Sequence, residues 1–249
     1  MVKIINKKNV TDSNSLKIRI KFNKKYSKYN FDKWINNYYD FKNKSVLDIG
    51  CGDGKQINSA IKQNKKNSTI IGVDLSLKSL EKISLKNKKN KNLKLINANM
   101  DNLKKIDSII KNKKFDLIHS TYAFYYSKNP MRLIKYLKTK LKKNSRLIIT
   151  MPEEKNTLKN ILNIREDNKK LRPEDIKNYL NKNFDMVQIN YLNNYQNVNS
   201  VKDLVSFYRS SGIYNENKLK FFSDYIKKKL SKDGYIKLIK SSVMFIGFN

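Results

Sequence analysis

Short apolar segments alternate with longer amphipathic segments through the middle of the chain. The apolar segments have the length of buried strands, and the amphipathic ones carry apolar residues at the spacing of one helix face. Strands are predicted at residues 45–49, 69–74, 93–97, 115–120 and 146–151. Helices are predicted at about 54–66, 77–89, 102–112 and 130–142. This alternation indicates βαβ units and a parallel sheet that helices cover on both faces.

The pattern is looser on either side of this region. Residues 14–41 are rich in aromatic side chains and predict one or two helices. After Pro152 the predicted elements are a helix at 155–182 interrupted near Pro173, a strand within 184–198, helices at 200–210 and 216–231, and a last strand at 235–247. Because no repeat or linker divides the chain, a single domain over residues 1–249 is expected.

The most informative stretch runs from Ser45 to Gly54. Three of the seven glycines of the chain fall there, at Gly50, Gly52 and Gly54. Glycine is used where the backbone turns tightly or approaches a ligand closely. A strand, a glycine turn and a helix N-terminus in this order form the kind of site that binds nucleotide-like ligands.

The charges around the turn indicate which ligand it holds. The spacing G-x-G-x-G differs from the dinucleotide fingerprint G-x-G-x-x-G, and Asp48 and Asp53 flank or enter the turn. These carboxylates would repel a pyrophosphate and attract a cationic ammonium. S-adenosylmethionine carries such an ammonium, together with a ribose and an adenine. The second strand ends at Asp74, in the position to hold the two ribose hydroxyls.

These residues resemble class I S-adenosylmethionine-dependent methyltransferases, in particular the small-molecule enzymes of the type 11 and type 12 kind. Residues 46–54 resemble the first motif of that family, and residues 72–76 resemble the second. Residues 98–103 and 115–120 are similar to two further motifs. The resemblance is close over residues 40–152 and holds only in outline elsewhere.

The family resemblance implies a fold. It is a Rossmann-like, doubly wound, mostly parallel sheet of seven strands, with helices on both faces and the last strand antiparallel. The single domain would consist of an N-terminal helical lid at 1–41, a cofactor-binding core at 42–152, and a substrate-side and sheet-completing part at 153–249. Helices inserted between the last two strands would cover the substrate.

The resemblance also implies S-adenosylmethionine as the cofactor. Asp48 would face its ammonium or cap the next helix, and Asp74 would hold the ribose or cap the helix that starts at Ser76. Asn99 stands where many relatives have an aspartate that accepts a hydrogen bond from the adenine amino group. The expected cofactor-binding residues are Asp48, Gly50, Cys51, Gly52, Asp74, Leu75, Asn99, Met100 and His119.

The expected reaction is a direct displacement, in which an O, N or C nucleophile of the substrate attacks the methyl carbon. Positioning of the two reactants supplies much of the rate, and a base helps if the nucleophile is a hydroxyl. The candidate catalytic residues are His119, the one histidine of the chain, and Tyr125, which falls where many relatives carry histidine. Rings that either line the substrate pocket or pack in the core are Tyr26, Tyr29, Trp34, Tyr122, Phe124 and Tyr126.

The net charge of +33 suggests a nucleic-acid partner. However, the lysines are spread along every helix, whereas a nucleic-acid footprint needs them clustered on one face. The motif of many base-amino methyltransferases is also absent, because residues 120–123 read Ser-Thr-Tyr-Ala. A small metabolite is therefore the favoured substrate, with RNA or protein as the alternative. A non-catalytic partner subunit of the same fold is a third hypothesis, which the intact first motif disfavours.

Other features narrow the setting of the protein. No segment has the length and apolarity of a membrane span, and residues 1–10 lack the features of a signal peptide. Cys51 is the one cysteine and cannot form an internal disulfide, which favours a reducing cytoplasm. One histidine and one cysteine do not make a usual metal site, so no metal is expected. A monomer or a homodimer is expected.

Overall fold

The computed structural model describes residue 9 and residues 12–64, 68–153, 157–164 and 171–249. Their contacts group into two compact units, each of which is built from separate stretches of chain. The larger unit comprises Asn36–Pro152, Lys170–Tyr191 and Val243–Asn249, and the smaller comprises Met1–Ile35, Glu153–Lys169 and Leu192–Ser242. The single domain expected from the sequence stays a prediction. The three segments expected within it, 1–41, 42–152 and 153–249, have other bounds than these two units.

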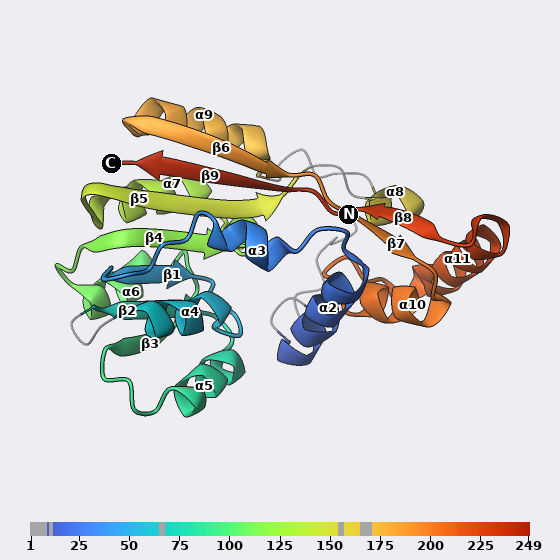
Figure 1. Ribbon diagram of the computed structural model, residues 1–249, viewed down its shortest axis with the longest axis horizontal. Helices are drawn as coiled ribbons and strands as arrows, with labels where there is room; N and C mark the ends of the chain where they lie inside the picture. Colours follow the sequence, from blue (N-terminus) through green and yellow to red (C-terminus); the bar gives the residue numbers. More distant parts are fainter. Residues whose placement is uncertain (1–8, 10–11, 65–67, 154–156, 165–170) are drawn as a thin grey trace. The chain divides into compact units, whose positions relative to one another are not determined.

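A seven-stranded sheet in the order β3-β2-β1-β4-β5-β9-β6 forms the larger unit (Figure 1). The strands are β1 Val46–Ile49, β2 Ile70–Asp74, β3 Leu93–Asn97, β4 Phe115–Thr121, β5 Leu141–Pro152, β6 Met186–Leu192 and β9 Ser242–Phe248. Strands β1 to β5 pair in parallel. The arrow of β9 runs against that of β5 in Figure 1. The predicted mostly parallel sheet with an antiparallel last strand is confirmed.

Helices of the larger unit cover both faces of the sheet. They are α4 Lys55–Gln63, α5 Leu77–Lys86, α6 Leu103–Ile110, α7 Pro130–Thr139 and α9 Pro173–Asn183, with the short 3-10 helix η1 Phe124–Tyr126. Leu47 and Ile49 of β1 join the main core cluster beneath α6, α7 and α9. Asp48 alternates to the opposite face because successive strand residues point to opposite sides. Its register partner Gly72 packs there against Ile57 of α4.

Strand β5 begins earlier than the apolar pattern predicts. The sequence placed a helix through residue 142 and a strand from residue 146, whereas α7 ends at Thr139 and β5 begins at Leu141. The three residues after Leu141 are polar and exposed, so they do not look like part of a buried strand. This polar first part of β5 explains why the helix was predicted too long.

The smaller unit combines helices with a two-stranded sheet. Its elements are α2 Ser13–Tyr26, α3 Phe31–Asn36, α8 Thr157–Ile161, β7 Tyr195–Val198, α10 Val201–Arg209, η2 Glu216–Lys218, α11 Leu219–Asp233 and β8 Ile236–Ile239. Strands β7 and β8 pair antiparallel. Phe22 of α2 stacks on Phe207 of α10, with ring centroids 4.2 Å apart, in a separate core cluster.

Two predicted strands are each divided in the structure. The predicted strand within 184–198 is β6 followed by β7, and the one at 235–247 is β8 followed by β9, with the halves in different sheets. Polar residues occupy both breaks, and the Lys240 N–H donates to the Asn194 carbonyl at 2.8 Å between them. Among the described residues, no helix is long and apolar enough to cross a membrane.

Candidate functional site

The turn after β1 depends on glycine at its first position. Gly50, Gly52 and Gly54 have φ values of 74°, 52° and 75°, the left-handed region that glycine enters without strain. A Cβ atom on Gly50 would lie only 2.2 Å from the Cβ of Ala123, in the segment after β4. The backbone of the turn therefore touches the β4 segment at a distance that leaves no room for a side chain.

Asp74 is held in a fixed orientation at the end of β2. Its Oδ2 accepts a hydrogen bond from the Gly52 N–H at 2.7 Å, and its Oδ1 accepts one from the Ser76 N–H at 2.8 Å. The side chain of Ser76 itself caps α5, so Asp74 is not the cap of that helix. The next residue, Leu75, is 56% exposed and presents an apolar surface beside the carboxylate.

The segment after β3 completes this edge of the sheet. The Met100 side chain reaches the glycine turn, because its Cε lies 3.7 Å from the position of a Cβ on Gly50. Asn99 is exposed, and its Oδ1 accepts a hydrogen bond from the Asp101 N–H at 2.9 Å. That acceptor is thus engaged in a local turn, although a carbonyl oxygen has a second lone pair for a ligand.

Cys51 fills space between strands. Its side chain is 6% exposed, and its Sγ lies 3.0 Å from the position of a Cβ on Gly72. Burial raises the pKa of the thiol well above its ordinary value, with the charges of Asp48 and Asp74 adding to the effect. A neutral, buried thiol is a packing group, which agrees with the interpretation of Cys51 as a small side chain that fits the turn.

Asp48 and His119 form a buried pair beneath the turn. They are register partners on β1 and β4, and the His119 Nδ1 lies 3.4 Å from the Asp48 Oδ1. The two residues are 1% and 0% exposed. Burial raises the pKa of Asp48 well above its ordinary value, and the charge of Asp74 adds to this. Burial lowers the pKa of His119 to about 3, so the imidazole is neutral at physiological pH.

The position of His119 bears on its expected roles. Its ring lies 4.9 Å from the ring of Tyr39 and 5.8 Å from that of Phe41, measured between centroids. The His119 side chain has no exposed surface. Full burial and a pKa lowered to about 3 make the imidazole a weak base, which speaks against general-base catalysis by His119.

The predicted aromatic residues after β4 have different environments. Tyr122 adopts a left-handed φ of 56°, and its N–H donates to the Thr150 carbonyl. Phe124 is fully buried in the main core cluster, which speaks against a place in the substrate pocket. The ring centroids of Tyr125 and Tyr126 lie 4.4 Å apart, and Tyr126 is 39% exposed. Tyr122, Tyr125 and Tyr126 remain candidates for substrate contact.

The other predicted pocket residues belong to the smaller unit. The Tyr26 hydroxyl donates to Asp203 at 2.6 Å, and Tyr29 is 45% exposed with its N–H bonded to Asn194. Trp34 packs near Phe31, with ring centroids 5.7 Å apart. Their place in a substrate pocket stays a prediction.

Sequence reasoning missed the residues that surround the Asp48–His119 pair. The Tyr39 hydroxyl shares a hydrogen bond of 2.8 Å with the Thr121 Oγ1, and Tyr39 is itself only 4% exposed. No spacing in the sequence links residue 39 to residue 119. The one available signal was the concentration of aromatic residues just before β1.

Comparison with known proteins gives a family. A family model described as a methyltransferase domain matches residues 40–193, which is more than half of the chain. No curated protein matches the sequence significantly. The fold is similar to that of YcgJ from Bacillus subtilis, with a TM-score of 0.61, 16% identity, and coverage of 88% of this chain and 97% of that one.

Two further solved structures share the fold. A SAM-dependent methyltransferase from Archaeoglobus fulgidus has a TM-score of 0.53 and 18% identity, covering 87% of this chain and 92% of its own. The plantazolicin methyltransferase BpumL in complex with SAH has a TM-score of 0.55 and 17% identity, covering 98% and 93%. The family model covers more than half of the chain, and the strand order of the sheet agrees with it. The protein therefore belongs to the methyltransferase domain family that its motifs resemble.

Proposed function

We propose that this protein transfers the methyl group of S-adenosylmethionine to an O, N or C nucleophile of a small metabolite. The observation that carries the proposal is the arrangement at the carboxyl ends of β1, β2 and β3. There the left-handed glycine turn, the oriented Asp74 carboxylate and the Met100 side chain come together. Ligands of open α/β sheets bind at this edge.

The residues present fit the cofactor. Asp74 is fixed by two backbone N–H groups and still has lone pairs for two hydroxyls. Leu75 offers exposed apolar surface next to it, suitable for a purine ring. The Asp48 Oδ2 is buried and has no hydrogen-bond partner among the described residues, so an ammonium beside it would satisfy an otherwise unpaired atom.

When bound, S-adenosylmethionine supplies an electrophilic methyl group on a cationic sulfur. The chain needs no covalent chemistry of its own for a direct displacement. Asp74 and the glycine turn would orient the cofactor, while Tyr122, Tyr125 and Tyr126 would orient the substrate and exclude water. Alignment of two reactants in this way can contribute about 7–11 kcal/mol to the rate. If the nucleophile is a hydroxyl, Tyr125 is the candidate base.

Two observations support a small substrate. The lysines are spread along most helices of both units rather than gathered in one segment of the chain. The solved structure of BpumL, which is similar over nearly the whole chain, has also been determined with desmethylPZN analogues and SAH. By analogy with a protein crystallised with such organic analogues, we propose a small substrate for this chain.

Two assays test the proposal. Calorimetry should show S-adenosylhomocysteine binding tightly and NAD binding far more weakly, because Asp48 and Asp53 flank the turn. Radiolabelled S-adenosylmethionine should then label a small-molecule extract but not total RNA or protein at moderate salt. NAD binding without S-adenosylhomocysteine binding would refute the cofactor assignment. Label at one defined RNA or protein position would replace the small metabolite as substrate.

A further inference from the structure

Asp48 and His119 are two ionisable side chains buried side by side, with polar atoms that lack hydrogen-bond partners among the described residues. A carboxyl group and an imidazole are both excluded from water, at 1% and 0% exposure. Their closest approach of 3.4 Å is slightly too long for a well-formed hydrogen bond. Besides Asp48 Oδ2, both ring nitrogens of His119 lack a hydrogen-bond partner among the residues that the structure describes. Unsatisfied polar groups of this kind are costly, so a folded protein rarely keeps them without a role.

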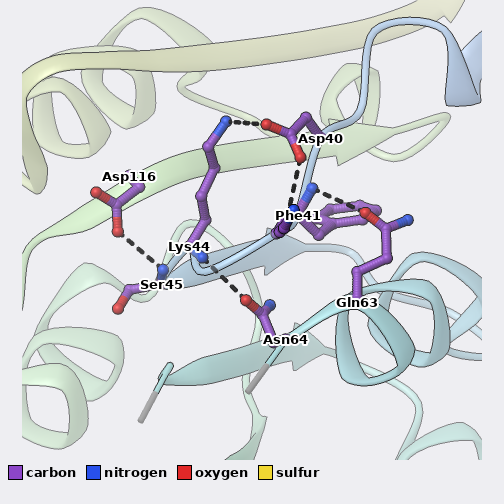
Figure 2. A network of polar contacts seen from close by, with 8 residues as sticks. Asp40, Phe41, Lys44, Ser45, Gln63, Asn64 and Asp116 are labelled. Atoms are coloured by element: carbon purple, nitrogen blue, oxygen red, sulfur yellow. Dashed lines mark hydrogen bonds and ion pairs between the residues drawn. The ribbon is translucent and has the colours of Figure 1, made fainter. Parts of the chain in front are cut away.

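The segment before β1 covers the His119 side of the pair, where the rings of Tyr39 and Phe41 lie against the imidazole. Figure 2 shows how it is held: the Phe41 N–H donates to Gln63 at 3.2 Å and the Lys44 N–H donates to Asn64 at 2.9 Å. The Ser45 N–H also donates to Asp116 at 2.8 Å. These contacts connect the segment to the end of α4 and the start of β4, so the cover formed by Tyr39 and Phe41 is fixed.

Several groups act on the charge of Asp48. His119 lies beside it on β4, and the negative charge of Asp74 on β2 opposes its ionisation. Cys51 in the turn is buried and neutral, and the Tyr39 hydroxyl is neutral because burial raises its pKa. Arg146 of β5 acts on Tyr39, and no cation among the causes of the shift stabilises the Asp48 carboxylate.

We propose that the pair of Asp48 and His119 carries one more proton in the ligand-free protein than in the ligand-bound protein, and that this proton is released to solvent when the cofactor ammonium binds beside Asp48. Before binding, the neutral acid donates its O–H to a ring nitrogen of His119. After binding, the carboxylate pairs with the ammonium and accepts the N–H of the other imidazole tautomer. His119 is thus a positioning residue for cofactor binding, and the inference rests on the proposed cofactor.

The imidazole is suited to this role because it can act as acceptor or donor toward the same neighbour by changing tautomer. A leucine can do neither. A glutamine can do both, because its amide can turn either its oxygen or its NH₂ group toward Asp48. The raised pKa of Asp48 and the lowered pKa of His119 agree with a neutral pair at physiological pH.

Proton release can be measured directly in the wild-type protein. Titration calorimetry with S-adenosylhomocysteine, in phosphate and in Tris at one pH, gives the number of protons released from the difference in heat between the buffers. About one proton should be released per ligand at neutral pH, and the Kd should fall about tenfold per pH unit until the pair ionises in the free protein. Binding without proton release would overturn the inference and leave the cofactor assignment intact. Absence of binding would refute both.

Three variants identify the source of the proton. Asp48→Asn should bind the ligand about tenfold or more weakly, with no proton release. Release that persists in this variant would come from the ligand or another group and would overturn the inference. His119→Leu should move the pH at which affinity levels off to a higher value, and His119→Gln should restore it. If both His119 variants change the melting temperature but not this pH profile, His119 is only structural and the inference fails.

Discussion

Replacement of Gly50 by alanine should damage the turn through two separable effects. The first effect is backbone strain, because placing an L-residue in the left-handed region at φ +74° costs about 1–2 kcal/mol of folding free energy. The second is the new methyl group, which would lie 2.2 Å from the Cβ of Ala123, whereas carbons in contact are normally about 3.5–4.0 Å apart. Overpacking of this kind costs about 1–3 kcal/mol. The free energy of unfolding should therefore fall by about 2–5 kcal/mol.

Two further substitutions separate these effects. Gly234 has a similar φ of +72° and nothing within 4 Å of an added Cβ, so Gly234→Ala should cost only the backbone contribution. Ala123→Gly removes the methyl group that Gly50→Ala would meet. Combined with Gly50→Ala, it should recover about 1–3 kcal/mol and leave the backbone cost in place.

Urea unfolding followed by circular dichroism gives the free energy of unfolding of the wild type, Gly50→Ala, Gly234→Ala and the double variant. Calorimetry with S-adenosylhomocysteine gives the ligand affinity of the same four proteins. Ligand affinity should fall in Gly50→Ala and recover in part in the double variant, because the turn regains its path. The reasoning is refuted if Gly50→Ala costs no more than Gly234→Ala. It is also refuted if Ala123→Gly restores nothing, since the contact would then not be the cause.

Three other substitutions have definite expected outcomes. Asp74→Ala removes an acceptor of two backbone N–H groups, so both the unfolding free energy and the cofactor binding energy should fall by about 1.5–3 kcal/mol. Lys111→Gly should stabilise the protein by about 1 kcal/mol or more, because φ 50° and ψ −127° strain a residue with a Cβ. Asp48→Asn leaves His119 to titrate alone, with a pKa of about 3 against an ordinary 6.5. The unfolded chain then binds more protons, so below pH 6.5 stability should fall relative to the wild type by about 1.4 kcal/mol per unit.

Each of these outcomes has its own check. Unchanged ligand affinity in folded Asp74→Ala would mean that this carboxylate only holds the turn. Chemical denaturation of Lys111→Gly is compared with Lys113→Gly, an exposed lysine without a positive φ, and equal effects would contradict the strain. For Asp48→Asn, the wild type should show no such slope between about pH 4 and 6.5, because the raised pKa of Asp48 offsets the lowered pKa of His119.

The sequence predicted the short strands that lie between clear helix patterns and mispredicted the strands that begin or break at polar residues. Strands β1 to β4 are short, and β1, β2 and β4 are largely buried; the ends of all four were located to within a residue. Strand β5 starts with exposed polar residues, and the breaks between β6 and β7 and between β8 and β9 fall at polar pairs. Local periodicity does not indicate which sheet a strand joins, because pairing is decided by contacts between distant residues.

The candidate site shows the same division. Gly50 and Asp74 were identified from local spacing, because the turn and the end of a strand are local features. The pairing of Asp48 with His119 was not, since it depends on the register of β1 against β4. The sequence indicated a functional position for His119, but only the structure shows its full burial beside Asp48.

The position of β9 has a consequence for synthesis. In the sheet it lies between β5 and β6, although it follows both in the chain. On the ribosome, β6 can emerge and lie near α9 but has no neighbouring strand until β9 has been made. Phe245 is buried, and the Asn249 N–H donates to the Ser145 carbonyl, so β9 is held along its length. Nascent or truncated chains that lack β9 would therefore expose two open strand edges, and such edges are prone to aggregation.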